Sequence, residues 1–153
     1  MRPLPRYKAC FVCGSGNPCG LRGVFRTNGK KVYYDFVPSD HHVGYKGRVH
    51  GGVISAALDE AMGWTVYVAT GGEMFYTWEI QVRFLRPVGP GMKLAVEAEF
   101  GEKRRAYYTA RGKLVDQEGT VFARAQGKYV AIPESEVKEV LTYLDEEIEN
   151  SKQ

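Results

Sequence analysis

The sequence predicts an α+β fold in which a curled antiparallel sheet wraps around one long central helix. One apolar segment, residues 51–69, is long and hydrophobic on nearly every side, which is typical of a buried helix. Two strand-like runs precede this segment, and four follow it with turns between them. At 153 residues, 44% of them hydrophobic, we expect a single domain over 1–153 with a substantial core.

The first half of the chain divides into four parts. Residues 1–20 hold three prolines, three glycines and all three cysteines, and predict irregular structure. The runs 24–27 and 31–37 flank Asn28-Gly29, two residues that tolerate positive φ, so they predict a hairpin. Residues 38–49 predict a loop before the central helix.

Four strand-like runs follow the glycines after the helix, and one helical run ends the chain. The strands are expected over 75–85, 92–100, 105–115 and 120–132. The first should turn Trp78, Ile80, Val82 and Phe84 to one face, and the last has a face of small residues, Val121, Ala123, Ala125 and Gly127, with Tyr129. Residues 133–149 predict an amphipathic helix with the stripe Val137, Val140, Leu141, Leu144 and Ile148. Such a sheet leaves edges that need pairing, so we expect a dimer.

Composition narrows the classes of function. The net charge of +3 suits an anionic small molecule, and basic and aromatic residues are not clustered, so we expect no nucleic-acid partner. Asp59 and Glu60 interrupt the longest apolar run, so we expect no membrane span. The N-terminus has no apolar core typical of a signal peptide, and three cysteines make no disulfide framework, so a cytoplasmic location is expected.

The start of the central helix and one acidic residue inside it suggest a reactive site. Gly51 and Gly52 leave helix N–H groups open to a carbonyl oxygen, whereas Asp59 is costly on an apolar face unless it has a function. At about 1.5 Å per residue, Gly51 and Asp59 lie roughly 12 Å apart. One helix cannot both bind a carbonyl oxygen and attack its carbon. Two antiparallel helices across a dimer axis could, so we expect a site shared between subunits.

Three motifs carry a resemblance to a known family. They are Cys10-Phe11-Val12-Cys13-Gly14 with Asn17-Pro18 and Gly20-Leu21, then His42-x-Gly44-x-x-Gly47-x-Val49-His50-Gly51-Gly52 with Asp59-Glu60-Ala61-Met62-Gly63, and finally Thr77 to Pro87. In this order the chain resembles hotdog-fold acyl-CoA thioesterases of the 4-hydroxybenzoyl-CoA thioesterase superfamily, in the branch of the phenylacetate-pathway thioesterases. The resemblance implies hydrolysis of an acyl- or aryl-CoA thioester by a homodimer or dimer of dimers, with no cofactor.

The resemblance also implies roles for single residues. Asp59 would be the nucleophile or the general base, and these alternatives stay open. Gly51 and Gly52 would supply the oxyanion N–H, His50 would shape the turn, and Thr77 would position water. The residues expected to contact substrate are Gly44, Gly47, Ser55, Met62, Arg83 and Arg86.

Gly44 stands where several members of the family carry an asparagine or glutamine. This departure favours an alternative, a non-catalytic module that binds acyl-CoA. A hydratase of the same fold is disfavoured because glycine stands at the position facing the acid.

Several side chains have a structural alternative to a functional role. Ser55 could bond to Asp59 or fill a gap, and we expect Glu60 to form a structural salt bridge. The arginines could bind coenzyme A phosphates or form a solvated strand face, and Trp64, Tyr67, Phe75 and Tyr76 could line an acyl pocket or belong to the core.

The cysteines also leave two alternatives. Cys10 and Cys13 resemble half of a zinc knuckle, for which Cys19 and either His41 or His42 would complete the ligands. The alternative, which we favour, is a glycine-rich lasso packed on the sheet without metal.

Overall fold

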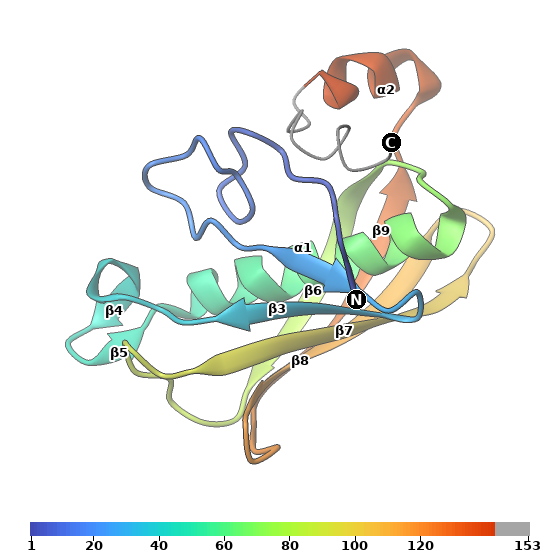
Figure 1. The fold of residues 1–153 in the computed structure, drawn as a ribbon. Coiled ribbons are helices and arrows are strands. Elements are labelled where there is room, and N and C mark those ends of the chain that lie inside the picture. The colour runs from blue at the N-terminus through green and yellow to red at the C-terminus, as the bar shows by residue number, and fades with distance from the viewer. Residues whose placement is uncertain (143–153) are drawn as a thin grey trace.

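The computed structural model describes residues 1–142, and it confirms the predicted architecture (Figure 1). A seven-stranded antiparallel sheet curls around the helix α1 (Gly51–Thr70), with the strand order β1-β2-β3-β7-β8-β9-β6. The strands are β1 (Arg2–Pro3), β2 (Phe25–Thr27), β3 (Lys31–Phe36), β6 (Phe75–Phe84), β7 (Leu94–Lys103), β8 (Tyr108–Asp116) and β9 (Val121–Ala131). The four strands after α1 therefore form one side of the sheet, and β6 is its outermost strand.

The helix α1 is buried along its middle, as its apolar composition predicts. Leu58, Ala61 and Met62 are fully buried, and the inward residues of β9 that face the helix include Ala123 and Ala125. The helix ends at Gly71, which adopts the left-handed conformation (φ 78°) and donates its N–H to Tyr67 O. This end fixes the direction in which the chain turns toward β6.

The predicted hairpin is present, but its turn differs in detail. Strands β2 and β3 pair in register, and only Gly29 has a positive φ (90°) in the turn between them. Asn28 instead contributes through its side chain, whose Oδ1 accepts the N–H groups of Lys30 and Lys31 at 3.0 and 2.8 Å. The asparagine thus closes the turn without leaving the common φ range.

The segment before α1 is more ordered than the predicted loop over 38–49. It forms the short helix η1 (Asp40–His42) and a small hairpin of β4 (Val43–Tyr45) and β5 (Arg48–Val49). Gly47, with φ 71°, allows the tight return between these strands. The prediction of a loop was wrong here because the hairpin depends on this short turn rather than on a periodic pattern.

Strand β6 differs from the predicted alternation at its start. The pairing with β9 shifts between Thr77 and Glu79, so Trp78 is an extra, bulged residue. Trp78 is 60% exposed and packs edge-on against Tyr107, with ring centroids 5.4 Å apart. The bulge removes Trp78 from the face of Ile80 and gives the inward position to Thr77.

The two ends of the chain complete the described structure. Apart from β1, residues 1–20 are irregular as predicted, and they lie over α1 on the side that the sheet leaves open (Figure 1). The helix α2 (Glu134–Leu141) confirms the start of the predicted C-terminal helix, whereas Leu144 and Ile148 of its predicted stripe lie outside the described residues. Within residues 1–142, neither helix is both long and apolar enough to span a membrane.

Candidate active site

The carboxylate of Asp59 is held by hydroxyl groups from two strands. Thr77 Oγ1 of β6 lies 3.1 Å from each carboxylate oxygen and donates its single proton to them. The Tyr129 hydroxyl of β9 lies 3.0 Å from Asp59 Oδ1 and 3.1 Å from the Asp59 backbone oxygen. Because Thr77 and Tyr129 are paired across the β6–β9 ladder, the sheet delivers both hydroxyls to the same side chain of α1.

The surroundings of Asp59 act on its pKa in opposite directions. Burial raises the pKa of this carboxyl above its ordinary value, and the hydrogen bonds from Tyr129 and Thr77 counteract part of that rise. Among the ion pairs of residues 1–142, none involves Asp59. Its charged form is therefore stabilised by neutral hydroxyl groups, which leaves it able to accept a proton or attack a carbon.

Tyr129 is a part of this site that the sequence analysis did not identify. It is fully buried, and burial together with the charge of Asp59 raises its pKa, so the phenol stays protonated and donates. Gly127 makes room for it, since a Cβ there would lie 2.7 Å from the Tyr129 hydroxyl. The signal in the sequence was a tyrosine on a face of small residues, because a buried phenol needs a partner.

The first turn of α1 presents one unoccupied donor. His50 caps the helix, with Nδ1 accepting the Gly52 N–H at 2.8 Å, and its backbone oxygen accepts the Val53 N–H at 3.0 Å. Within the described chain, no acceptor is bonded to the Gly51 N–H. Of the two predicted oxyanion donors, Gly51 is thus the one that remains free to bind a carbonyl oxygen.

The Gly51 N–H and the Asp59 carboxylate both belong to α1, and they lie beside opposite ends of β6. Asp59 lies over Thr77 near the start of this strand, whereas Gly51 packs against the ring of Phe84 at its end. The rise of α1 separates Gly51 and Asp59 by roughly 12 Å. The described chain therefore does not bring them together within one subunit.

The other predicted substrate contacts are scattered. Gly44 lies against His50, where a Cβ would come within 3.1 Å of the ring, and Gly47 lies in the β4–β5 turn. Ser55 Oγ donates to Gly51 O at 2.8 Å rather than to Asp59. Met62 is fully buried beneath the sheet, which is a core position.

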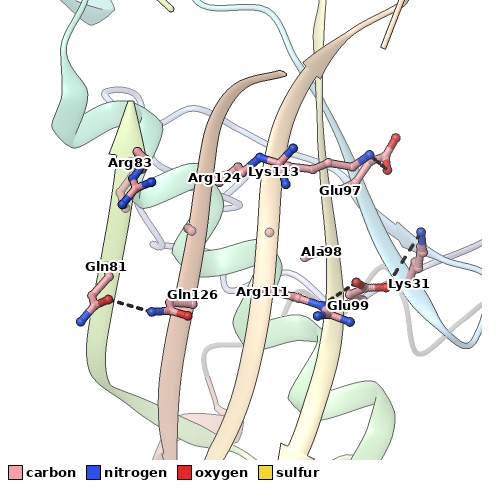
Figure 2. Close-up of a pocket in the computed structure, with 13 residues that line it drawn as sticks. Lys31, Gln81, Arg83, Glu97, Ala98, Glu99, Arg111, Lys113, Arg124 and Gln126 are labelled. Atoms are coloured by element: carbon pink, nitrogen blue, oxygen red, sulfur yellow. Dashed lines mark hydrogen bonds and ion pairs between the residues drawn. The ribbon is translucent and has the colours of Figure 1, made fainter. Parts of the chain in front are cut away.

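The predicted arginines lie away from Asp59. Arg83 lines a groove of about 630 Å³ on the sheet face that points away from α1, together with charged side chains of β7, β8 and β9 (Figure 2). Many of these charges are paired, as in Arg111–Glu99 at 2.7 Å and Lys113–Glu97 at 3.2 Å. Arg86 donates to Val121 O at 2.7 Å. The paired charges of β7 and β8 fit the structural alternative of a solvated strand face, whereas no ion pair among residues 1–142 includes Arg83 or Arg86.

Aromatic residues near the far end of α1 are divided between core and surface. Trp64 is buried and stacks on Tyr7 with ring centroids 5.7 Å apart, so it belongs to the core. Phe75 packs edge-on against Tyr129 at 5.4 Å. Tyr76 is exposed and donates to Glu136 of α2.

The expected salt bridge of Glu60 was wrong. Its Oε1 accepts the indole N–H of Trp64 at 3.1 Å, and its Oε2 lies 3.7 Å from Cys10 Sγ. The zinc alternative named Cys19 and either His41 or His42 as further ligands, and the structure does not group them with Cys10 and Cys13. Cys19 is exposed, and His42 Nδ1 accepts the Ser39 N–H within η1. Sequence spacing could not indicate that the N-terminal segment would fold onto Glu60.

Comparison with known proteins identifies related chains. A family model described as "Thioesterase superfamily" matches residues 46–123, which include Asp59, Gly51 and Thr77. Acyl-coenzyme A thioesterase THEM5 of Mus musculus is 30% identical over 110 residues, covering 71% of this chain and 43% of that protein. The chain thus spans less than half the length of this curated relative.

Two solved structures share the fold at moderate identity. A thioesterase superfamily protein is 25% identical, with a TM-score of 0.71 over 80% of this chain and 60% of the other. A phenylacetic acid degradation-related protein from Ralstonia eutropha is 26% identical, with a TM-score of 0.60 over 72% of this chain and 85% of the other. Both likenesses cover more than two thirds of this chain.

Proposed function

Because this chain belongs to the thioesterase superfamily, we propose that it hydrolyses an acyl- or aryl-coenzyme A thioester to a free acid and coenzyme A. The single observation that carries the proposal is the half-buried Asp59 carboxylate, which Thr77 and Tyr129 orient and which forms no ion pair with any of residues 1–142. The name of the mouse relative supports the choice of acyl-coenzyme A as the substrate class.

The arrangement supports a hydrolysis that needs no cofactor. Asp59 either attacks the thioester carbon directly or removes a proton from a water that attacks it. In the second route, the new C–O bond forms while the proton passes to Asp59, the C–S bond then breaks, and the coenzyme A thiolate takes up a proton. Tyr129 occupies Oδ1, so Oδ2 is the better placed oxygen for either role.

The second half of the proposed site is the Gly51 N–H of a partner subunit. Within residues 1–142, β6 is an edge strand of the sheet and pairs only with β9, so its other edge is open to a second strand. If two β6 strands pair antiparallel, the Thr77 end of one meets the Phe84 end of the other. Asp59 then lies beside the partner subunit's Gly51, whose N–H would stabilise the charge on the thioester oxygen.

This pairing supports the proposal of a homodimer, which can assemble further as a dimer of dimers. Exposed apolar side chains gather along β6 and just after it, namely Tyr76, Trp78, Phe84 and Leu85. A dimer would bury part of this surface. We further propose that Arg83 and Arg86 bind the phosphates of coenzyme A, and that the protein works in the cytoplasm, where its three free cysteines would stay reduced.

The test measures free thiol released from a panel of aliphatic and aromatic acyl-coenzyme A thioesters by the purified protein. We expect turnover from wild type and a loss of about 10²–10⁴-fold in Asp59→Asn. The matched control is Asp116→Asn, which changes an acid at the end of β8. Wild-type turnover in Asp59→Asn would overturn the assigned mechanism.

The same panel distinguishes the non-catalytic alternative. The absence of an amide side chain at Gly44 is the feature that favours an acyl-CoA-binding module. Binding of acyl-coenzyme A by wild type, measured by calorimetry, without any thiol release would contradict hydrolysis and favour that module.

A further inference from the structure

A second cluster of reactive side chains lies beside Asp59 on the opposite side of α1 from the sheet. Cys10, Cys13 and Glu60 each direct one ligand atom into it, and these atoms all lie within 4.8 Å of one another. Glu60 follows Asp59 in the chain, but neighbouring helical residues point in different directions, so the cluster is separate from the proposed active site. The hydrolysis proposed above uses none of these three groups.

The turn that carries the two cysteines is built to present their sulfur atoms. Cys10 Sγ accepts the N–H groups of Val12 and Cys13 at 3.3 and 3.5 Å, and Cys13 Sγ accepts the Tyr7 N–H at 3.4 Å. Gly14 closes the turn, because a Cβ there would lie 2.4 Å from Cys10 O. Backbone N–H groups directed at sulfur favour the thiolate, which is the form that binds metals.

The cluster gathers three ionisable side chains in a partly buried place. Burial raises the pKa of Glu60 to about 7, while the hydrogen bond from Cys13 lowers the pKa of Cys10 to about 5. The same hydrogen bond and burial raise the pKa of Cys13. Across residues 1–142, no ion pair includes Glu60. A cation held between the three ligand atoms would contact all of them, because these atoms lie within 4.8 Å of one another.

We propose that Cys10, Cys13 and Glu60 bind one Zn²⁺ ion. In a tetrahedral site, Zn–S bonds of about 2.3 Å and Zn–O bonds of about 2.0–2.2 Å place a sulfur and an oxygen roughly 3.5 Å apart. Cys10 Sγ and Glu60 Oε2 are 3.7 Å apart before any adjustment. Two thiolates with one carboxylate select zinc over magnesium or calcium, which prefer oxygen ligands alone.

Zinc binding would displace the protons that the thiols and carboxyl group share, and these would pass to solvent. The three protein ligands leave the fourth tetrahedral position to a water molecule. Because Cys10 and Glu60 are fifty residues apart, the ion would fasten the N-terminal segment to α1. The two cysteines lie outside residues 46–123, so the site would be an addition to the matched family region.

The experiment titrates the full chain with Zn²⁺, after chelation and reduction, against a chromophoric chelator. We expect one equivalent bound per chain, and thiolate-to-metal charge-transfer absorption when Co²⁺ replaces Zn²⁺. Cys10→Ser and Cys13→Ser should abolish that absorption, and Glu60→Gln should weaken zinc binding about 10–100-fold. Cys19→Ser is the matched control and should bind as wild type does.

Two further outcomes would overturn the zinc site. One is wild type that binds no zinc after chelation and reduction, whether Cys10 and Cys13 stay free thiols or form a disulfide during the titration. The other is a Cys19→Ser variant that loses as much affinity as Cys13→Ser. If circular dichroism shows that a ligand variant does not fold, measurements on wild type still test the zinc site. Zinc should raise its melting temperature and cobalt should give the thiolate absorption. These readouts do not depend on thioester hydrolysis.

Discussion

At the residue scale, the Asp59 carboxylate accepts hydrogen bonds from two hydroxyl groups that are buried to different degrees. Tyr129 is fully buried and fixed by packing against Phe75, whereas Thr77 lies on the exposed, outermost strand. Tyr129 also donates to the Asp59 backbone oxygen, so it ties β9 to α1 at the site itself. The phenol is therefore a positioning residue, because it acts on the reaction through Asp59.

Tyr129→Phe should move the acid limb of the pH profile of kcat/KM to higher pH. The hydrogen bond from Tyr129 lowers the pKa of Asp59, so its removal raises that pKa. The active carboxylate is present above the pKa and is lost as the pH falls through it. Activity at alkaline pH should fall much less than activity at acidic pH. Rates measured across the pH range check this.

The matched control is Tyr34→Phe, which removes a hydroxyl from a buried tyrosine that packs on Phe25 and Phe36. It should leave the acid limb where wild type has it. An unchanged limb in Tyr129→Phe, or an equal movement in Tyr34→Phe, contradicts a role of the Tyr129 hydroxyl in setting the pKa of Asp59.

At the element scale, the site depends on how closely β9 approaches α1. The inward face of β9 carries Ala123, Ala125 and Gly127, and only then the large ring of Tyr129. The two inward alanines of β9 are almost fully buried. The small side chains let the sheet lie close to the helix, so that the phenol reaches the carboxylate directly.

Gly127→Ala should lower both stability and activity. The added Cβ would lie 2.7–2.9 Å from the Tyr129 ring and hydroxyl, and the buried ring must move away from Asp59. Overpacking of this kind costs about 1–3 kcal/mol. We expect a lower melting temperature, and a loss of kcat/KM at least as large as that of Tyr129→Phe.

Gly89→Ala is the control for Gly127→Ala, because its Cβ would meet only atoms at 3.7 Å or beyond. It should leave the melting temperature and kcat/KM close to wild type. If Gly127→Ala keeps wild-type kcat/KM while Tyr129→Phe loses activity, the close approach at Gly127 does not position the phenol.

At the element scale, the sequence predicted correctly those features that depend on residues close together in the chain. The apolar length of α1 and the Asn28-Gly29 turn act within a few residues, and both were found. The bulge at Trp78 was not predicted, because it arises from pairing with β9 some fifty residues later. A bulge changes which residues point inward without changing composition, so alternation alone cannot reveal it.

The sequence predicted only part of the candidate site, because the other part depends on contacts between residues far apart in the chain. The candidates Asp59, Gly51 and Thr77 come from motifs that are continuous in sequence, and Thr77 does contact Asp59. Tyr129 and the pairing of Glu60 with Cys10 arise from contacts across the fold. The sequence contains these residues, but only the packing of β9 and of the N-terminal segment onto α1 brings them to their partners.

At the scale of the whole molecule, the proposed reaction needs two subunits. Each chain holds a complete carboxylate and a complete helix start, yet roughly 12 Å of helix separates them. Within residues 1–142, the open edge of β6 passes both groups, from Thr77 beside Asp59 to Phe84 beside Gly51. A symmetric dimer through this edge would contain two equivalent sites, each with groups from both chains.

Mixing two inactive variants should therefore restore activity. Gly51→Pro removes the proposed oxyanion N–H, and proline is tolerated at the first helical position. Either it or Asp59→Asn alone should retain about 1% of wild-type activity or less. A mixed dimer keeps one intact site, formed by Asp59 of the Gly51→Pro chain and Gly51 of the Asp59→Asn chain. With random exchange of subunits, co-expressed variants should reach about a quarter of wild-type thiol release. If the two groups acted within one chain, no mixture would exceed the variants alone.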